Sequence, residues 1–121
     1  MATRAAGPAV ESFLPLTSVV FEILVTLAGA DHHGYSILMD VRERTGERLR
    51  AGSLYRAIGR LLDDALVEEL DERPDSRIDD ERRRYYRLTD LGRRVAAAEA
   101  ARLATQVRHA RAANLLGKRG G

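Results

Sequence analysis

The segment GSLYRAIGRLLDDALVEEL, residues 52–70, decides the fold that this sequence predicts. Its first part carries apolar side chains at the spacings of three and four residues that are typical of one helix face. These residues are Leu54, Ile58, Leu61, Leu62 and Ala65. Ser53 precedes the first of them and belongs to a preferred class of N-cap residue, so we expect it to cap the helix. The last part, from LVEEL onward, is typical of a short strand.

The other side of this predicted helix carries Arg56 and Arg60, one turn apart. An arginine on a helix in the DNA major groove can form two hydrogen bonds to guanine, which favours a base-reading role for both residues. For Arg60 the alternative is a salt bridge with Asp63 or Asp64.

A second strand is predicted in ERRRYYRLTDLGRR, residues 81–94, where alternation separates two faces. One face holds Arg84, Tyr86 and Leu88, and the other holds Arg83, Tyr85 and Arg87. We expect Tyr86 and Leu88 to pack in the core. The residues of this strand that we expect to contact DNA phosphates or a minor groove are Arg82, Arg83, Arg84, Tyr85 and Arg87. The alternative is that the ten acids of residues 63–81 neutralise these arginines across the hairpin.

Two hydroxyl groups of the predicted reading helix complete the candidate DNA site. Ser53, at the helix start, and Tyr55, on its flank, can donate hydrogen bonds to a phosphate or a base. For Tyr55, packing against the second strand is an equal alternative.

The chain before this helix predicts two more helices. Residues 1–14 lack an apolar period and indicate a flexible or partly ordered arm. A helical stripe then begins at Leu16 and ends near Gly29, and Phe21 and Val25 add apolar surface on another side. Because such a helix is covered on more than one side, we expect a second subunit there. HGYSILMDVRERTG predicts the next helix, and its Gly-containing link to the Ser53 helix gives the outline of a helix-turn-helix.

The chain after the hairpin predicts a long final helix. We expect Thr89 to cap it and the helix to span residues 89–116, followed by a disordered tail at 117–121. Its apolar spacing suits packing against a partner helix. The residues that we expect at the dimer interface are Phe21, Val25, Val95, Leu103 and Val107.

Composition excludes several classes of protein. The 121 residues include no cysteine and no apolar run of about 18 residues, so disulfides and a membrane-spanning helix are excluded and a cytoplasmic location is expected. The adjacent His32 and His33 lack an acid cluster to complete a metal site, and a loop or helix-start role is the better interpretation. No enzyme motif is present, so we expect neither catalysis nor a cofactor.

The order of three helices, a hairpin and a helix is that of a winged helix. With HGYSILMDVRERTG, LRAGSLYRAIGRLLDDALVE and RRRYYRLTDLGRR in that order, residues 16 to about 95 resemble the PadR family of transcriptional regulators. The resemblance implies a winged helix-turn-helix that binds operator DNA as a dimer, usually as a repressor, with the last helix supplying much of the dimer contact. A single final helix is similar to the smaller subgroup, some of whose members bind flat drugs between tryptophans. This chain has no tryptophan, so that pocket is not carried over.

The sequence therefore predicts a mainly α protein with a small β-hairpin: a winged helix-turn-helix at residues 15–88 and a dimerisation helix at 89–116. The expected function is a dimeric, DNA-binding repressor, which a small-molecule effector between the first and last helices releases from double-stranded operator DNA. The alternative, suggested by the acidic stretch 63–81, is a winged-helix module that binds proteins and does not bind DNA directly.

Overall fold

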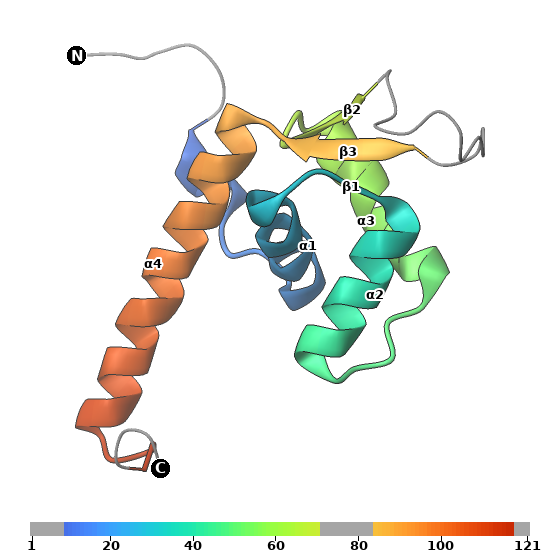
Figure 1. The fold of residues 1–121 in the computed structure, drawn as a ribbon. Helices are drawn as coiled ribbons and strands as arrows, with labels where there is room; N and C mark the ends of the chain where they lie inside the picture. The colour runs from blue at the N-terminus through green and yellow to red at the C-terminus, as the bar shows by residue number, and fades with distance from the viewer. Residues whose placement is uncertain (1–8, 71–83, 118–121) are drawn as a thin grey trace.

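The computed structural model describes residues 9–70 and 84–117. Its elements are η1 (Val10–Phe13), α1 (Ser18–Gly29), β1 (His32–His33), α2 (Gly34–Thr45), α3 (Ala51–Asp63), β2 (Val67–Leu70), β3 (Tyr85–Leu88) and α4 (Asp90–Ala112). Figure 1 shows α1, α2 and α3 grouped next to a small sheet, with α4 extending away on the opposite side. The predicted class, mainly helical with a winged helix-turn-helix and a long final helix, is confirmed.

The sheet has three antiparallel strands in the order β1-β3-β2. β2 and β3 form the predicted hairpin, in which Val67 pairs with Leu88 and Leu70 with Tyr85. β1 was not predicted as a strand: His32 and His33 pair with β3 on its other edge. A strand of two residues is too short to show alternation, so only the fold reveals it.

The core lies where the three grouped helices meet the sheet and the start of α4. It includes the completely buried Ile23, Leu24, Ile37, Leu54 and Val95. The predicted stripe on α3 is confirmed for Leu54, Ile58 and Leu61. It is wrong for Ala65, which is exposed after the end of the helix and has a φ of 61°. The turn into β2 requires this left-handed backbone, and Leu66 and Val67 take the buried places instead.

Side-chain caps fix where several helices begin. The Thr89 hydroxyl accepts the backbone N–H of Gly92 at 2.9 Å, which confirms the predicted cap of α4. His33 Nδ1 accepts the N–H of Ser36 at 3.1 Å, so the helix-start role predicted for this residue is confirmed. The predicted Ser53 cap is wrong. α3 begins at Ala51, three residues earlier than a Ser53 cap would place it, with Arg50 at the N-cap and no side-chain bond there, so Ser53 lies within the first turn.

The described part of the predicted N-terminal arm is partly ordered. η1 packs on α4, and Val10 and Phe13 are partly buried against the core. Nearby, the carboxylate of Glu99 on α4 is only 2% exposed and accepts two hydrogen bonds from Arg102, at 2.9 and 2.8 Å. The backbone N–H of Leu16 also donates to it. Glu99 therefore anchors α4 to the chain just before α1.

Candidate DNA-binding surface

The start of α2, the start of α3 and the outer end of β3 lie on the same side of the molecule, opposite α4 (Figure 1). Arg56 and Arg60 are exposed on the face of α3 opposite its buried stripe. Within residues 9–70 and 84–117 neither arginine has an ion-pair partner, and the alternative salt bridge of Arg60 with Asp63 or Asp64 is not formed. Both guanidinium groups are thus available to another molecule.

Ser53 lies beside Arg56 in the first turn of α3. The Nη2 group of Arg56 donates to the Ser53 hydroxyl at 3.4 Å, a long bond between two partly or fully exposed side chains. The structure therefore brings together a hydroxyl and a free cation at the start of the predicted reading helix. Both groups can hydrogen-bond to phosphate or to base edges.

Tyr55 connects α3 to the start of α2. Its ring lies over Gly34, where the Cβ of any larger residue would overlap the ring. The side chain is nevertheless 47% exposed. Tyr55 therefore packs on α2 while keeping part of its ring at the candidate surface.

The wing arginines that the structure describes are both paired with acids. Arg84 Nη1 lies 3.1 Å from Glu69 Oε2. Arg87 lies between Asp31, at 3.6 Å, and Glu68, at 3.7 Å. Cross-strand neutralisation, the alternative raised by the sequence, therefore occurs at these two positions. Arg82 and Arg83, also predicted to contact DNA, lie outside the described residues.

The two faces of β3 follow the predicted alternation. Tyr86 and Leu88 are buried, as expected, at 5% and 7% exposure. Burial, and to a lesser degree Glu69 and Tyr55, raise the pKa of the Tyr86 phenol. Tyr85 is half-buried on the other face, with its ring edge-on to His33 at a centroid distance of 5.4 Å. The phosphate contact predicted for Tyr85 has to compete with this packing.

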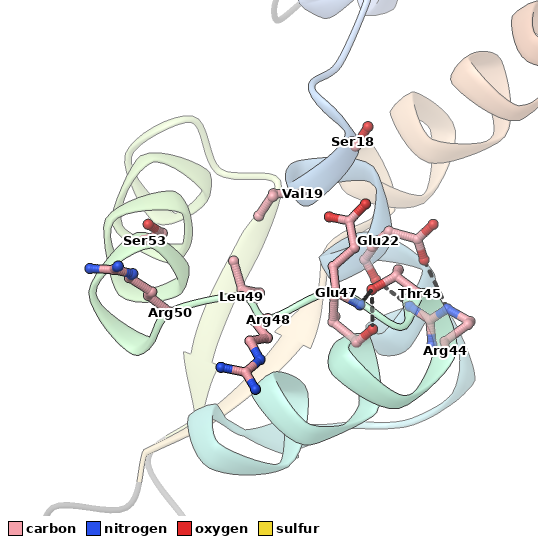
Figure 2. Close-up of a pocket in the computed structure, with 11 residues that line it drawn as sticks. Ser18, Val19, Glu22, Arg44, Thr45, Glu47, Arg48, Leu49, Arg50 and Ser53 are labelled. Carbon is pink, nitrogen blue, oxygen red and sulfur yellow. Dashed lines mark hydrogen bonds and ion pairs between the residues drawn. The ribbon is translucent and has the colours of Figure 1, made fainter.

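A hollow of about 600 Å³ lies beside the start of α3 (Figure 2). Val19, Val41 and Leu49 provide its apolar lining, and Arg48 and Arg50, on the link between α2 and α3, also line it. Both arginines are exposed and, among the residues that the structure places, neither has an ion-pair partner. They are candidate phosphate contacts that the sequence interpretation missed. Their position directly before the reading helix was the available signal.

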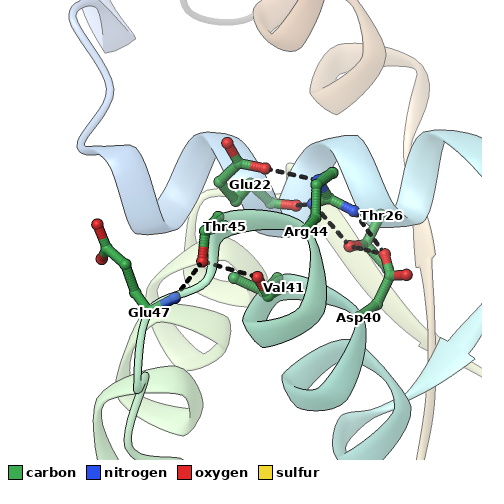
Figure 3. A network of polar contacts seen from close by, with 7 residues as sticks. All are labelled: Glu22, Thr26, Asp40, Val41, Arg44, Thr45 and Glu47. Carbon is green, nitrogen blue, oxygen red and sulfur yellow. Dashed lines mark hydrogen bonds and ion pairs between the residues drawn. The ribbon is translucent and has the colours of Figure 1, made fainter.

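A polar network holds α2 against α1 (Figure 3). Arg44 bonds the carboxylates of Glu22 at 2.8 Å and Asp40 at 2.6 Å, and it also donates to the buried Thr26 hydroxyl at 3.1 Å. The Thr26 hydroxyl donates to Asp40, and this bond, followed by those from Arg44, lowers the pKa of the Asp40 carboxyl. Arg44 thus links α2 to α1 and helps to fix the position of α2 in the helix-turn-helix.

The residues predicted at a dimer interface fall into two groups. Phe21 and Val25 line an apolar cavity of about 250 Å³ between α1 and α4. Val107 on the distal half of α4 is 43% exposed, and Leu103 is half-buried. Val95 has no exposed surface and belongs to the core of its own chain, so its predicted interface role is wrong. The spacing of apolar residues along α4 does not distinguish the half of the helix that is buried in its own chain from the half that is exposed.

The described residues, 9–70 and 84–117, lack two further features. No helix there is long and apolar enough to cross a membrane. No group of three or more histidine, aspartate or glutamate side chains in these ranges could hold a metal ion.

Known proteins match both the sequence and the fold. Residues 23–98 match the model of the transcriptional regulator PadR-like family. A PadR-family transcription regulator from hypervirulent Clostridium difficile R20291 is 26% identical, with a TM-score of 0.70 over 78% of this chain and 96% of that one. RosR of H. salinarum, 23% identical with a TM-score of 0.63 over 86% and 99% of the two chains, shows the same fold.

A sequence relative also matches part of the chain. An uncharacterised 37.1 kDa protein in transposon TN4556 of Streptomyces fradiae is 37% identical over 78 residues, which are 64% of this chain. This chain covers 21% of that relative's length. The family match spans well over half of the present chain and includes α2, α3, the hairpin and the start of α4. The chain therefore belongs to the PadR-like family of transcriptional regulators.

Proposed function

We propose that the protein is a cytoplasmic, homodimeric repressor that binds a specific double-stranded operator through α3 and the wing. The observation that carries the proposal is that Arg56 and Arg60 on α3 are exposed and have no ion-pair partner among the described residues. A helix can place such groups in the major groove, where each can bind guanine with two hydrogen bonds. In this proposal Ser53 and Tyr55 contact the flanking backbone, and Arg82, Arg83 and Arg84 of the wing bind phosphate.

Dimerisation is proposed from the apolar surface between α1 and α4. Phe21, Val25 and a row of alanines on α4 line the cavity there, and the distal half of α4 leaves Val107 exposed. Small side chains allow the close approach of a second helix, and we propose that a second copy of the chain supplies it. Two copies related by a two-fold axis then require an operator with two half-sites, about one helical turn or a multiple of it apart.

Release of the DNA by an effector is proposed from the cavity between α1 and α4. A small apolar molecule could occupy the 250 Å³ cavity between Phe21, Val25 and α4, and there it would change how the two copies pack. Thermal-shift screening tests this idea, because a ligand of the folded dimer raises its melting temperature. An effector should also release bound DNA, and a compound that stabilises the protein without releasing DNA does not qualify.

The decisive experiment is a mobility-shift assay with DNA flanking the protein's own gene, repeated over a range of salt concentrations. We expect a complex with two protein chains whose affinity falls steeply as salt rises, because phosphate contacts release counterions. A stable dimer that binds none of these fragments would contradict the proposal. The protein-interaction alternative would then be preferred if a protein partner remained bound after Arg84 and Arg87 were changed to glutamate.

A further inference from the structure

We propose that Glu69 competes with DNA phosphate for Arg84, and so lowers the affinity of the wing for the backbone of any DNA sequence. The inference rests on the proposed function, DNA binding through α3 and the wing. It assigns to an acidic residue of β2 a role that the arginine pattern alone does not show.

The register of the hairpin places Glu69 and Arg84 on the same face of the sheet. Glu69 pairs with Tyr86 across the strands, and Arg84 lies two residues before Tyr86, so both share the face on which Tyr86 is buried. Tyr86 belongs to the same buried cluster as Leu54 and Ile58 of α3, so this face of the sheet is turned toward the core to which α3 contributes. Arg84 is therefore the described wing arginine that lies on the same side as the reading helix.

Arg87 lies on the opposite face and has a different environment. It projects from the central strand and is flanked by Glu68 on β2 and by Asp31 just before β1. Two carboxylates offset its single charge, and its position connects the two outer parts of the sheet. We therefore assign Arg87 to the structure of the sheet, and Arg84 to the phosphate contact.

The Glu69–Arg84 pair is open to exchange. The side chains are 35% and 62% exposed, and Arg84 Nη1 lies 3.1 Å from one carboxylate oxygen and 3.5 Å from the other. An exposed pair of this kind is weak, so a phosphate can displace the carboxylate, at a cost in affinity of roughly 1.5- to 5-fold. Because phosphate contacts carry no sequence information, the cost is the same for operator and random DNA.

The test compares four proteins by fluorescence anisotropy on an operator fragment and on a random duplex of equal length. They are the wild type, Glu69→Gln, Arg84→Ala and the double variant. We expect Glu69→Gln to bind both duplexes roughly 1.5- to 5-fold more tightly. Arg84→Ala should bind both more weakly and reduce the slope of log K against log salt concentration by about 0.9, the value for one lost phosphate contact. In the Arg84→Ala background, Glu69→Gln should have no further effect.

Glu68→Gln is the matched control, because it removes the same charge from the neighbouring residue on the other face of β2. We expect it to leave affinity within the error of the wild type. If Glu68→Gln raises DNA affinity as much as Glu69→Gln does, the effect is general repulsion between carboxylates and phosphates. The same conclusion follows if Glu69→Gln still raises affinity in the Arg84→Ala background. Either result would overturn the proposed competition. If the wild type binds DNA and Glu69→Gln binds it no more tightly, this inference is wrong and the proposed function is unaffected. Wild-type protein that binds no DNA overturns the proposed function as well.

Discussion

Arg56 and Arg84 are both exposed arginines on the candidate surface, yet their nearest neighbours differ. Among the described residues Arg56 donates a hydrogen bond to the Ser53 hydroxyl and has no acidic partner, whereas Arg84 pairs with the Glu69 carboxylate. A guanidinium without a counter-ion loses little when it binds a base, but a paired one first has to exchange its partner. These contacts suit the unpaired Arg56 to base reading and the paired Arg84 to the phosphate backbone.

Arg56→Ala is expected to relax sequence preference. Loss of a bidentate guanine contact costs about 1 to 3 kcal/mol on the correct sequence and little on random DNA. The ratio of operator to random affinity, measured by anisotropy at fixed salt, should therefore fall about 5- to 150-fold. Arg94→Ala removes the same charge from an exposed position on α4 and should leave the ratio unchanged. If Arg56→Ala lowers the affinity for both duplexes equally, this residue does not read a base.

Glu99 gives a prediction for pH. Its hydrogen bonds from Arg102 come first among the causes that lower its pKa below the ordinary value, while burial opposes them. Because the folded-state pKa is depressed, the stabilisation is complete above the ordinary carboxyl pKa and is lost as pH falls through the folded-state pKa. We expect Glu99→Gln to lower the free energy of unfolding at pH 7 by about 1 to 3 kcal/mol.

Urea unfolding of wild type and Glu99→Gln at pH 7 and near pH 3 checks this prediction. The difference between the two proteins should narrow at the lower pH, because the loss of this stabilisation begins once the pH falls below the ordinary carboxyl pKa. A difference that stays constant over this range would show that Glu99 contributes through packing and not through its charge.

At the scale of elements, the contact of α4 with the turn between α3 and β2 fixes the base of the wing. The Thr89 hydroxyl donates to the Ala65 carbonyl at 2.7 Å, and the Thr89 N–H donates to Leu66 at 3.1 Å. Gly92 lies in the same contact, where an added Cβ would overlap the Leu66 carbonyl and come within 2.9 Å of Leu88 Cδ1. A backbone obstacle cannot move aside as a flexible side chain can.

Gly92→Ala is therefore expected to destabilise the fold by about 1 to 3 kcal/mol through overpacking. Gly59→Ala is the matched control, because an added Cβ on α3 at that position meets nothing within 4 Å. Alanine favours a helix by about 1 kcal/mol over glycine, so Gly59→Ala should be slightly stabilising. Thermal and urea unfolding of both variants measure these opposite signs. A neutral Gly92→Ala would mean that α4 shifts away from the turn without loss of packing.

At the scale of the whole molecule, the proposed function depends on how two copies place their α3 helices. Only the first half of α4 is buried in its own chain, through Gly92, Val95 and Glu99, while the distal half is largely open. The buried half fixes the direction in which α4 leaves the domain. In the proposed dimer, that direction sets the distance between the two reading helices and thus the spacing of the half-sites.

Ala97→Glu is expected to convert the dimer to a monomer. Ala97 is exposed and lines the cavity between α1 and α4, where the dimer would bury the added carboxylate, and pairing with Arg93 on the same cavity would not offset the cost of its desolvation. Light scattering coupled to gel filtration should show half the mass with an unchanged circular dichroism spectrum. Affinity for a two-site operator should fall at the same time, since each copy then binds alone. Met39→Glu, at an exposed position on α2, should remain dimeric. A dimeric Ala97→Glu would place the interface elsewhere.

Local signals in the sequence determined the helices, the hairpin and the family. The stripe of Leu54, Ile58 and Leu61 and the cap at Thr89 depend on side chains within one or two turns, so spacing alone reveals them. The alternation that buries Tyr86 and Leu88 is equally local. For the same reason Arg56 and Arg60 could be placed outward as soon as the buried face of α3 was known.

Only the tertiary structure decided the features that depend on residues far apart in the chain. The strand pairing of His32 and His33, the internal burial of Val95 and the pairing of Arg84 with Glu69 join segments whose separation leaves no period in the sequence. The sequence does not reveal whether a charged side chain contacts water, a carboxylate or a phosphate. Packing alone brings the partner into reach, and that is why the candidate arginines were evident from the sequence while their separate roles depended on the fold.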